Sequence, residues 1–456
     1  MYHSNDRKLT KGIILSYVTS SLGSNCLWML NNYFLLYFYT DVIQIPAMAA
    51  TVILFIARVW DAINDPMMGV ICDKTHHKEG RARFWLKRMA VPAAICIALS
   101  YFCPNWATPA KVVWVGITYI LQGMAQTAVG VPLSSLRVSM TSNRVERVKL
   151  SQYMAIPSAI ANFAIPALTM PFVRQFGEGR MGVGFAVLAA IIGIIYGAST
   201  LYVWQATKGY DPDTSLSSDN GAAAAKEPSA LELIKAGFQN KYCLLVCLAY
   251  CTYLLLSGIM GSTLIYYFTY NLQNEGLMST YSGMAVVGNI ISIFVMRLFG
   301  KKFGNAKTCM LGGVFCIIAF GFRIVTGDQI FAVFALAILL IGFGSGFVSN
   351  MMNQCILDAT TYGKLHGMDN QSVVMSLFTF AQKFGQAASS VLAAALLALF
   401  NYTAGDVPSQ TILNLFYVEN MIIPVVIAII MMGLLIIINR MEKQMLNELA
   451  AQDKKA

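Results

Sequence analysis

Charged residues and histidine are both scarce in this sequence. Only 12% of its 456 residues are Asp, Glu, Lys or Arg, whereas a soluble domain carries about 25%. The four histidines are His3, His76, His77 and His366, and all of them lie in polar segments outside the apolar runs. No apolar run therefore offers a zinc ligand set or a base for a nucleophile. We expect no enzyme and no resident metal or cofactor.

Long apolar runs take the place of the missing charge. Hydrophobic residues make up 57% of the chain. Runs of about 20 apolar residues recur from end to end, and each is long enough to cross roughly 30 Å of hydrocarbon. The polar first residues and the long first run do not fit a cleavable signal peptide. The sequence predicts an all-α polytopic membrane protein with twelve transmembrane helices, at about 12–40, 46–72, 88–104, 110–138, 152–174, 182–205, 240–270, 278–298, 308–325, 330–357, 372–400 and 411–439.

The basic residues are distributed unevenly between the two sides of these spans. Almost all of the 32 Lys and Arg lie on the same side as the N-terminus. By the positive-inside rule, both termini are expected in the cytoplasm, in the cytoplasmic (inner) membrane of a bacterium. The net charge of +10 then reflects topology and attraction to the lipid bilayer, and no nucleic acid partner is expected.

One polar segment divides the chain. The stretch "ATKGYDPDTSLSSDNGAAAAKEPSALELIKAGFQNKY" has the composition of a linker. We predict a six-helix half at 1–205, a cytoplasmic linker at 206–239, a second six-helix half at 240–440 and a cytoplasmic tail at 441–456. The basic loop "GVICDKTHHKEGRAR" has an echo in "GKKFGNAKT". Two halves related by such a repeat are typical of transporters, with the substrate site near the midplane.

The second apolar run carries a cluster of charge. Asp61 and Asp65 are four residues apart, so both carboxylates point the same way from a helix. Arg58 precedes them by one turn, and Asn64 adjoins them. Each charge would cost several kcal/mol in lipid, so the cluster must face a polar interior. Carboxylate and amide oxygens suit a small cation, and the same carboxylates could instead carry a proton.

The structural alternative is a salt-bridge network that only joins helices. Arg58 cannot neutralise both acids, so one carboxylate needs a mobile cation or a distant lysine. Lys383, in "FTFAQKFGQAASS", is the other clear cation within a span. We place it at the central cavity, as a charge partner or as a substrate contact.

Two polar stripes predict a binding cavity. Asn25, Trp28 and Asn32 share one face of the first span, and Gln126 and Thr127 lie together in the fourth. Amides, hydroxyls and an indole suit a polyhydroxylated solute, since each sugar hydroxyl needs a partner once it is desolvated. The alternative for any single Asn is a hydrogen bond between helices.

Several motifs carry a family resemblance. The stretch "YFLLYFYTDVIQIPAMAATVILFIARVWDAINDPMMGVICDKT", followed by "GRAR", closely resembles the glycoside–pentoside–hexuronide:cation symporters, the melibiose carrier group of the major facilitator superfamily. The resemblance continues in "YILQGMAQTAVGVPLSSL", "ERVKLSQYM", "DATTYG" and "FTFAQKFGQA". It implies the major facilitator fold, with two six-helix pseudo-symmetric halves, and symport of a sugar by alternating access. Separately, we expect the protein to function as a monomer.

The resemblance assigns roles to particular residues. It implies that the coupling cation is Na⁺, with H⁺ or Li⁺ as alternatives. The cation-binding residues are Asp61, Asn64, Asp65 and Thr127. Coupling or gating falls to Arg58, Asp73 and Arg81. The substrate-binding residues are Asn25, Trp28, Asn32, Gln126, Thr379 and Lys383.

The sugar site departs from the melibiose carrier pattern. Asn25 and Gly130 replace two acids, Ala155 replaces an arginine, and Ser134 replaces a tryptophan. Without the two acids, and with Lys383 kept, the cavity should repel an anionic sugar less strongly. The sequence therefore favours a hexuronide or glucuronide, with a neutral pentoside or β-glycoside as the alternative. Two other functions stay open, a lipid or lysolipid cation symporter and a non-transporting sugar sensor.

Overall fold

The computed structural model describes residues 9–140, 144–177, 180–211, 240–366, 371–402 and 408–453. These residues form helices and short connections, with no strand among them. The chain divides into two compact units. The first unit spans Met1–Ala222 together with Ala394–Val407, and the second unit spans Ala223–Ala393 together with Pro408–Ala456.

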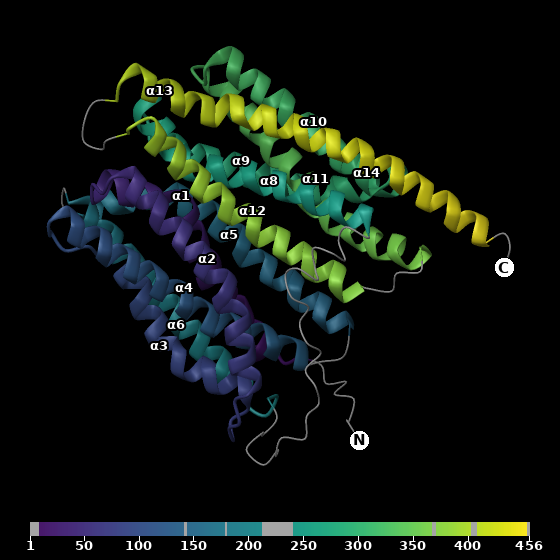
Figure 1. The fold of residues 1–456 in the computed structure, drawn as a ribbon, viewed down its shortest axis with the longest axis horizontal. Helices are drawn as coiled ribbons and strands as arrows, with labels where there is room; N and C mark the ends of the chain where they lie inside the picture. The colour runs from purple at the N-terminus through teal and green to yellow at the C-terminus, as the bar shows by residue number, and fades with distance from the viewer. Residues whose placement is uncertain are drawn as a thin grey trace. The chain divides into compact units, whose positions relative to one another are not determined.

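The first unit is a bundle of six long helices (Figure 1). Within it, α1 packs against α5 and α6, α3 packs against α4 and α6, and α2 packs against α4. A single π-turn, η1, continues α1. The elements are α1 (Lys11–Tyr37), η1 (Phe38–Val42), α2 (Ala47–Asp73), α3 (Arg81–Ser100), α4 (Thr108–Ser139), α5 (Arg144–Phe176) and α6 (Met181–Ala206).

The second unit repeats this plan, with its last helix broken by a π-turn (Figure 1). In this unit α11 packs against α9 and α10, while α14 packs against α8 and α10. The elements are α8 (Lys241–Tyr266), η2 (Tyr267–Asn271), α9 (Leu277–Phe303), α10 (Asn305–Thr326), α11 (Phe331–Leu365), α12 (Gln371–Leu399), α13 (Gln410–Tyr417), η3 (Val418–Ile422) and α14 (Ile423–Asp453).

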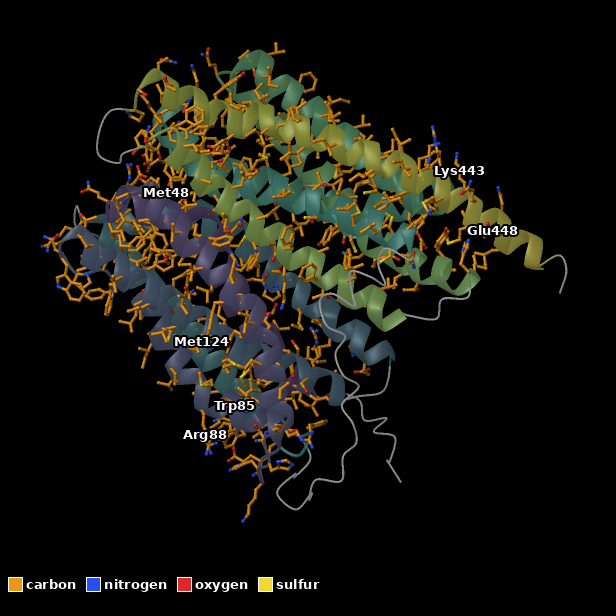
Figure 2. All side chains as sticks on the ribbon, viewed as in Figure 1. Met48, Trp85, Arg88, Met124, Lys443 and Glu448 are labelled. Carbon is orange, nitrogen blue, oxygen red and sulfur yellow. The ribbon has the colours of Figure 1, made fainter. Side chains whose placement is uncertain are left out.

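The prediction of an all-α polytopic membrane protein is confirmed. Among the described residues there are twelve long helical segments, and ten of them are long and apolar enough to cross a membrane. The other two are α3, which has four basic residues in its first eight, and α12. Figure 2 shows mostly carbon along the middle of the helices, with nitrogen-tipped side chains near Arg88 of α3 and Lys443 of α14.

Three helices begin with a side-chain cap. Thr10, Asn240 and Ser409 precede α1, α8 and α13, and each side-chain oxygen accepts the N–H three residues on. The donor–acceptor distances are 3.4, 3.0 and 3.4 Å. Such caps satisfy one of the N–H groups that a helix start leaves without a partner.

An internal repeat is visible where the first helix of each unit ends. The segments "YFYTDVIQ" (37–44) and "YYFTYNLQ" (266–273) both form a π-turn. In each, the N–H of the sixth residue after the helix donates to a carbonyl five residues back, at 3.0 Å from Ile43 and 3.1 Å from Leu272. Both segments then place a glutamine at positive φ, 58° for Gln44 and 51° for Gln273. The two units therefore share a local structure that a residue-by-residue comparison of the two segments could have predicted.

A second repeat lies at the two basic loops. Gly80 and Gly304 adopt nearly the same backbone angles, with φ of 92° and 87°, and each precedes a helix. A carboxylate caps that helix in both units. Asp211 accepts the N–H of Arg83 at 2.9 Å, and Glu442 accepts the first two N–H groups of α10 at 2.8 and 2.9 Å. A Cβ at either glycine would crowd the capping carboxylate. Both positions therefore favour glycine, because of this crowding and because of the positive φ.

Candidate functional site

The charged face of α2 lies against α4 in the first unit. The Oγ1 of Thr127 donates a hydrogen bond to Oδ1 of Asp65 at 2.8 Å. This contact links the two helices through one carboxylate and one neutral donor. A hydroxyl that donates to a carboxylate keeps its own lone pairs, so both oxygens of the pair can face a cation.

Asp61 approaches α4 at a glycine. A Cβ built on Gly123 would lie 2.9 Å from Oδ1 of Asp61, closer than a side chain tolerates. On its other side, Asp61 meets Arg58 in a loose ion pair, with Nη1 and Oδ2 3.7 Å apart. The two side chains are 26% and 37% exposed. This geometry is far from the bidentate contact in which Arg binds carboxylates most strongly.

Asn64 completes the cluster on α2. It is only 4% exposed, and its Nδ2 has no hydrogen-bond partner among the described residues. With both acids ionised, the single cation Arg58 leaves the cluster with a net charge of −1. Two carboxylates, an amide and a hydroxyl from two packed helices are an oxygen-rich set that suits a hard monovalent cation. The structure thus joins Asp65 to Thr127 and places Asp61 against α4 at Gly123, with Asn64 buried on the same helix.

The predicted sugar-binding residues of α1 fall into two environments. The amide of Asn25 is engaged by neighbours, since its Nδ2 donates to Ser21 O at 2.7 Å and its Oδ1 accepts from Ser158 at 3.0 Å. These contacts tie α1 to α5. Trp28, one turn further on, is 37% exposed, and Asn32 is half-buried.

On α4, Gln126 is half-buried next to Thr127. A Cβ at Gly130 would meet no atom within 4 Å, so there is open space at the position where the melibiose carrier pattern has an acid.

The remaining two predicted substrate residues lie on α12. Thr379 and Lys383 are one turn apart and both are exposed. The Thr379 hydroxyl donates to Met375 O of its own helix at 3.0 Å. Gln382, by contrast, turns towards Tyr250 of α8, with 3.5 Å between Nε2 and the hydroxyl. Within the second unit, Lys383 therefore lies on the exposed face of α12.

The predicted gating residues lie around the turn between α2 and α3. Asp73 is the last residue of α2, but its side chain lies outside the described part of the chain. Arg81 opens α3 half-buried, and its Nε has no partner among the described residues. The neighbouring Arg83 is fully engaged instead, donating to Trp204 O from Nε and Nη2 at 3.1 and 3.0 Å. Sequence reasoning missed this contact between α3 and α6.

A second contact at this turn involves Glu79. Its carboxylate accepts from Lys87 Nζ at 2.9 Å and from Trp204 Nε1 at 3.3 Å. The hydrogen bond from Lys87 is the main reason that the pKa of Glu79 is lowered. Burial raises the pKa of Asp211 nearby, against the lowering effect of the backbone N–H groups that it caps.

Comparison with known proteins identifies this architecture. A family model described as MFS/sugar transport protein matches residues 16–440. The isoprimeverose transporter of Lactiplantibacillus pentosus is 27% identical, covering 90% of this chain and 85% of the relative. In Escherichia coli (strain K12), the putative glycoside/cation symporter YagG is 24% identical, and the match covers 92% of this chain and 90% of that relative. The glucuronide carrier protein homolog of the same strain is 23% identical and covers 90% and 88%.

Solved structures share the fold. A bacterial homologue of the iron transporter ferroportin, in its inward-facing state, superposes with a TM-score of 0.66 at 12% identity. The match covers 94% of this chain and 98% of that one. At this identity the likeness concerns the fold alone.

Proposed function

Because the chain belongs to the MFS/sugar transport protein family, we propose that it is a symporter that imports a sugar or glycoside together with Na⁺. The observation that carries this proposal is the oxygen-rich contact between α2 and α4, where Thr127 bonds Asp65 and Gly123 makes room for Asp61. Its curated relatives include a glycoside/cation symporter, which supports the same function.

The mechanism follows from the charge of this contact. Without a cation the cluster of Arg58, Asp61 and Asp65 has a net charge of −1, which is unfavourable in a membrane. A bound Na⁺ neutralises it and fixes Thr127 against α2. Gln126 precedes Thr127 in α4, so fixing one orders the other beside the sugar cavity. This coupling must be reciprocal, and the sugar must tighten Na⁺ binding by the same factor.

The direction of transport follows from the membrane potential. Asp61 and Asp65 accept the ion from outside, the two units alternate access around the loaded site, and both ligands leave into the cytoplasm. An inside-negative potential contributes about 2.3 kcal/mol per charge per 100 mV to this uptake. We place the protein in the cytoplasmic membrane of a bacterium, with both termini inside, and working as a monomer.

The substrate is proposed to be an anionic sugar. Asn25 and the open space at Gly130 remove two negative charges that would repel a uronate, and Lys383 can add a positive one. The glucuronide carrier homolog supports a glucuronide, whereas the isoprimeverose transporter supports a neutral pentose-containing sugar as the second choice.

The test is uptake into proteoliposomes that hold the purified full-length chain. An imposed Na⁺ gradient should drive accumulation of a labelled glucuronide or, as second choice, of a neutral pentoside. A proton gradient alone, with no Na⁺ present, should not. Accumulation of lysolipid and of no sugar would overturn the proposal in favour of a lipid carrier, and sugar binding without any uptake would indicate a sensor.

A further inference from the structure

The second unit contains a carboxyl group that the proposed cycle does not use. Glu419 lies in the π-turn η3, inside the apolar segment that runs from Gln410 to Leu449. Its side chain is 0% exposed. Neither Oε1 nor Oε2 has a hydrogen-bond partner among the described residues. π-turns inside α-helices occur frequently at functional sites.

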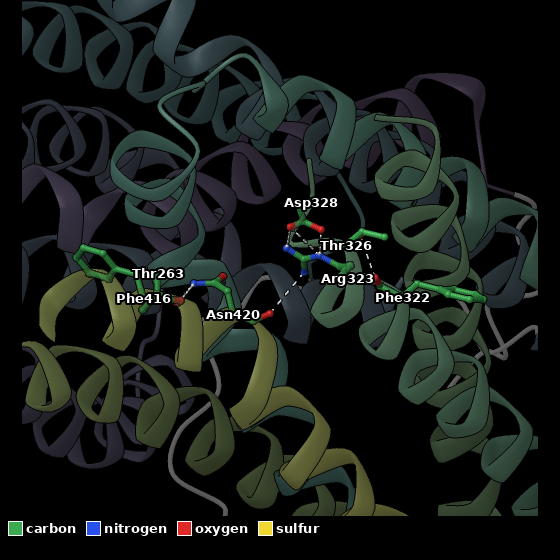
Figure 3. A network of polar contacts seen from close by, with 7 residues as sticks. All are labelled: Thr263, Phe322, Arg323, Thr326, Asp328, Phe416 and Asn420. Atoms are coloured by element: carbon green, nitrogen blue, oxygen red, sulfur yellow. Dashed lines mark hydrogen bonds and ion pairs between the residues drawn. The ribbon is translucent and has the colours of Figure 1, made fainter. Parts of the chain in front are cut away.

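The cation that contacts the backbone of η3 is already engaged. Arg323 of α10 is itself completely buried and binds Asp328, with Nη2–Oδ2 at 2.7 Å and Nε–Oδ1 at 3.0 Å (Figure 3). Its remaining nitrogen, Nη1, donates to the backbone carbonyl of Asn420 at 3.5 Å. Arg323 therefore serves Asp328 and a carbonyl of η3, not the carboxyl of Glu419.

The adjacent amide is engaged as well. Asn420 is 0% exposed, and its Nδ2 donates to Thr263 Oγ1 at 3.3 Å and to Phe416 O at 3.0 Å (Figure 3). The Oδ1 of Asn420 has no partner among the described residues. Both consecutive polar side chains of η3 therefore hold acceptor oxygens that no described donor reaches.

The elements packed against η3 are α8, α10, α13 and α14. Besides Arg323 of α10 and Asp328 after it, the titratable groups at the adjoining ends of these elements are tyrosines of α8, of η2, which continues α8, and of α13. They are Tyr266, Tyr267, Tyr270 and Tyr417. Along α14 the next titratable residue is Arg440, roughly six turns away. No bond from any of these groups reaches the carboxyl of Glu419.

An ionised carboxylate in such a place would be a buried and uncompensated charge. Its desolvation would cost several kcal/mol, and no described cation or donor offsets that cost. A protonated carboxyl carries no net charge and avoids it. We propose that Glu419 is a proton-binding site in the second unit, neutral in the folded protein and separate from the carboxylates of α2.

The consequence goes beyond the proposed symport. The proton on Glu419 keeps η3 packed against α8 and α10, and its loss at alkaline pH places a bare charge in this packing. We expect Na⁺-driven uptake by the wild type to fall at alkaline pH. Glu419→Gln copies the neutral acid, so it should retain uptake and remove that fall.

The direct test is infrared spectroscopy of the purified protein, which needs no transport. A protonated carboxylic acid gives its own C=O stretching band. We expect that band at neutral pH in the wild type and its loss, by one acid's intensity, in Glu419→Gln. The matched control is Glu448→Gln, because Glu448 is an exposed acid on α14 and should leave the band unchanged. An identical band in the wild type and Glu419→Gln would overturn the proposal.

A second measurement uses the wild type alone, in case Glu419→Gln does not fold. Dicyclohexylcarbodiimide enters apolar regions and reacts with protonated carboxyl groups. Peptide mapping should find Glu419 labelled at neutral pH and Asp328 unlabelled, because Asp328 is held in a buried ion pair with Arg323. Labelling of Asp328 with none at Glu419 would contradict the proposal. Neither readout depends on Asp61 or Asp65 binding Na⁺.

Discussion

The two units carry their buried charges in opposite ways. In the first unit, Arg58 and Asp61 are 3.7 Å apart and 26% and 37% exposed, and Asp65 receives a hydrogen bond from a neutral threonine. In the second unit, Arg323 and Asp328 meet at 2.7 Å, with both side chains fully buried. The formal charges of Arg58, Asp61 and Asp65 sum to −1, whereas those of Arg323 and Asp328 sum to zero.

We infer from this difference that the cluster in the first unit binds a ligand, whereas the ion pair in the second unit stabilises the fold. The units share the π-turn that ends their first helix and their capped glycine loops, so these backbone features do not account for the difference. Arg323 and Asp328 are fully buried and bonded to each other, so this pair does not present a net charge to a ligand. A loose pair beside a second carboxylate retains both charge and oxygen atoms, which is what a cation site requires.

The largest effect on stability is expected at the buried ion pair of Arg323 and Asp328. Arg323→Gln leaves Asp328 buried without its partner and should destabilise the protein by about 3–5 kcal/mol. The measurement is thermal unfolding in detergent. Arg58→Gln, the matched change in the first unit, should shift stability by about 1 kcal/mol or less because that pair is loose and partly exposed. Equal destabilisation by both changes would break the comparison. The double change Arg323→Met with Asp328→Leu should recover most of the loss.

The hydrogen bond at the open cluster should matter for affinity more than for stability. Thr127→Val removes the donor to Asp65, and a bond to a charged group contributes about 1.5–3 kcal/mol. We expect Na⁺ affinity to fall roughly 10- to 100-fold, measured by Na⁺ titration of uptake. Thr127→Ser keeps the donor and should keep the affinity. A normal Na⁺ dependence in Thr127→Val would remove Thr127 from the site.

Substitutions at two glycines of α4 test whether Asp61 binds Na⁺. Gly123→Ala adds a methyl group that meets Oδ1 of Asp61 at 2.9 Å and must displace it. We expect an affinity loss for Na⁺ of about tenfold, or about 1.4 kcal/mol. Gly130→Ala is the matched control, since its methyl group enters open space and should leave Na⁺ affinity unchanged. The same uptake assay measures both, and equal effects would count against a role for Asp61.

The smallest effect concerns pH at the exposed turn of the first unit. The pKa of Glu79 is lowered mainly by its bond from Lys87. A lowered pKa means that this stabilisation is present above the ordinary value of 4.5 and is lost as pH falls through the lower folded value. Thermal unfolding below pH 4.5 should show a small loss that Lys87→Gln reduces. The same pH profile in both proteins would refute this reading.

Much of the architecture could be predicted from hydropathy. The predicted span at about 182–205 corresponds to α6 (Met181–Ala206). Hydropathy misplaced the ends of those helices that continue through polar residues. The predicted span at about 88–104 begins seven residues after α3 does, because α3 opens with "RARFWLKR". Hydropathy locates the hydrocarbon-crossing part of a helix, whereas caps and packing decide where the helix starts.

The candidate site was predictable only in part. The i, i+4 spacing of Asp61 and Asp65 places them on one face, but the contact of Asp61 with Gly123 depends on how two helices pack. Glu419 was overlooked, although a lone acid in "FYVENMIIP" was a visible signal. That its oxygens have no partner depends on Arg323 closing onto Asp328, which the sequence cannot reveal.

The most direct test of the cation site is Na⁺ binding to the purified protein, measured by calorimetry with and without sugar. The wild type should bind Na⁺, and the sugar should tighten that binding by the factor by which Na⁺ tightens sugar binding. Asp65→Asn keeps the shape of the side chain and removes its charge, and it should bind no measurable Na⁺. Unchanged Na⁺ binding by Asp65→Asn would contradict the account.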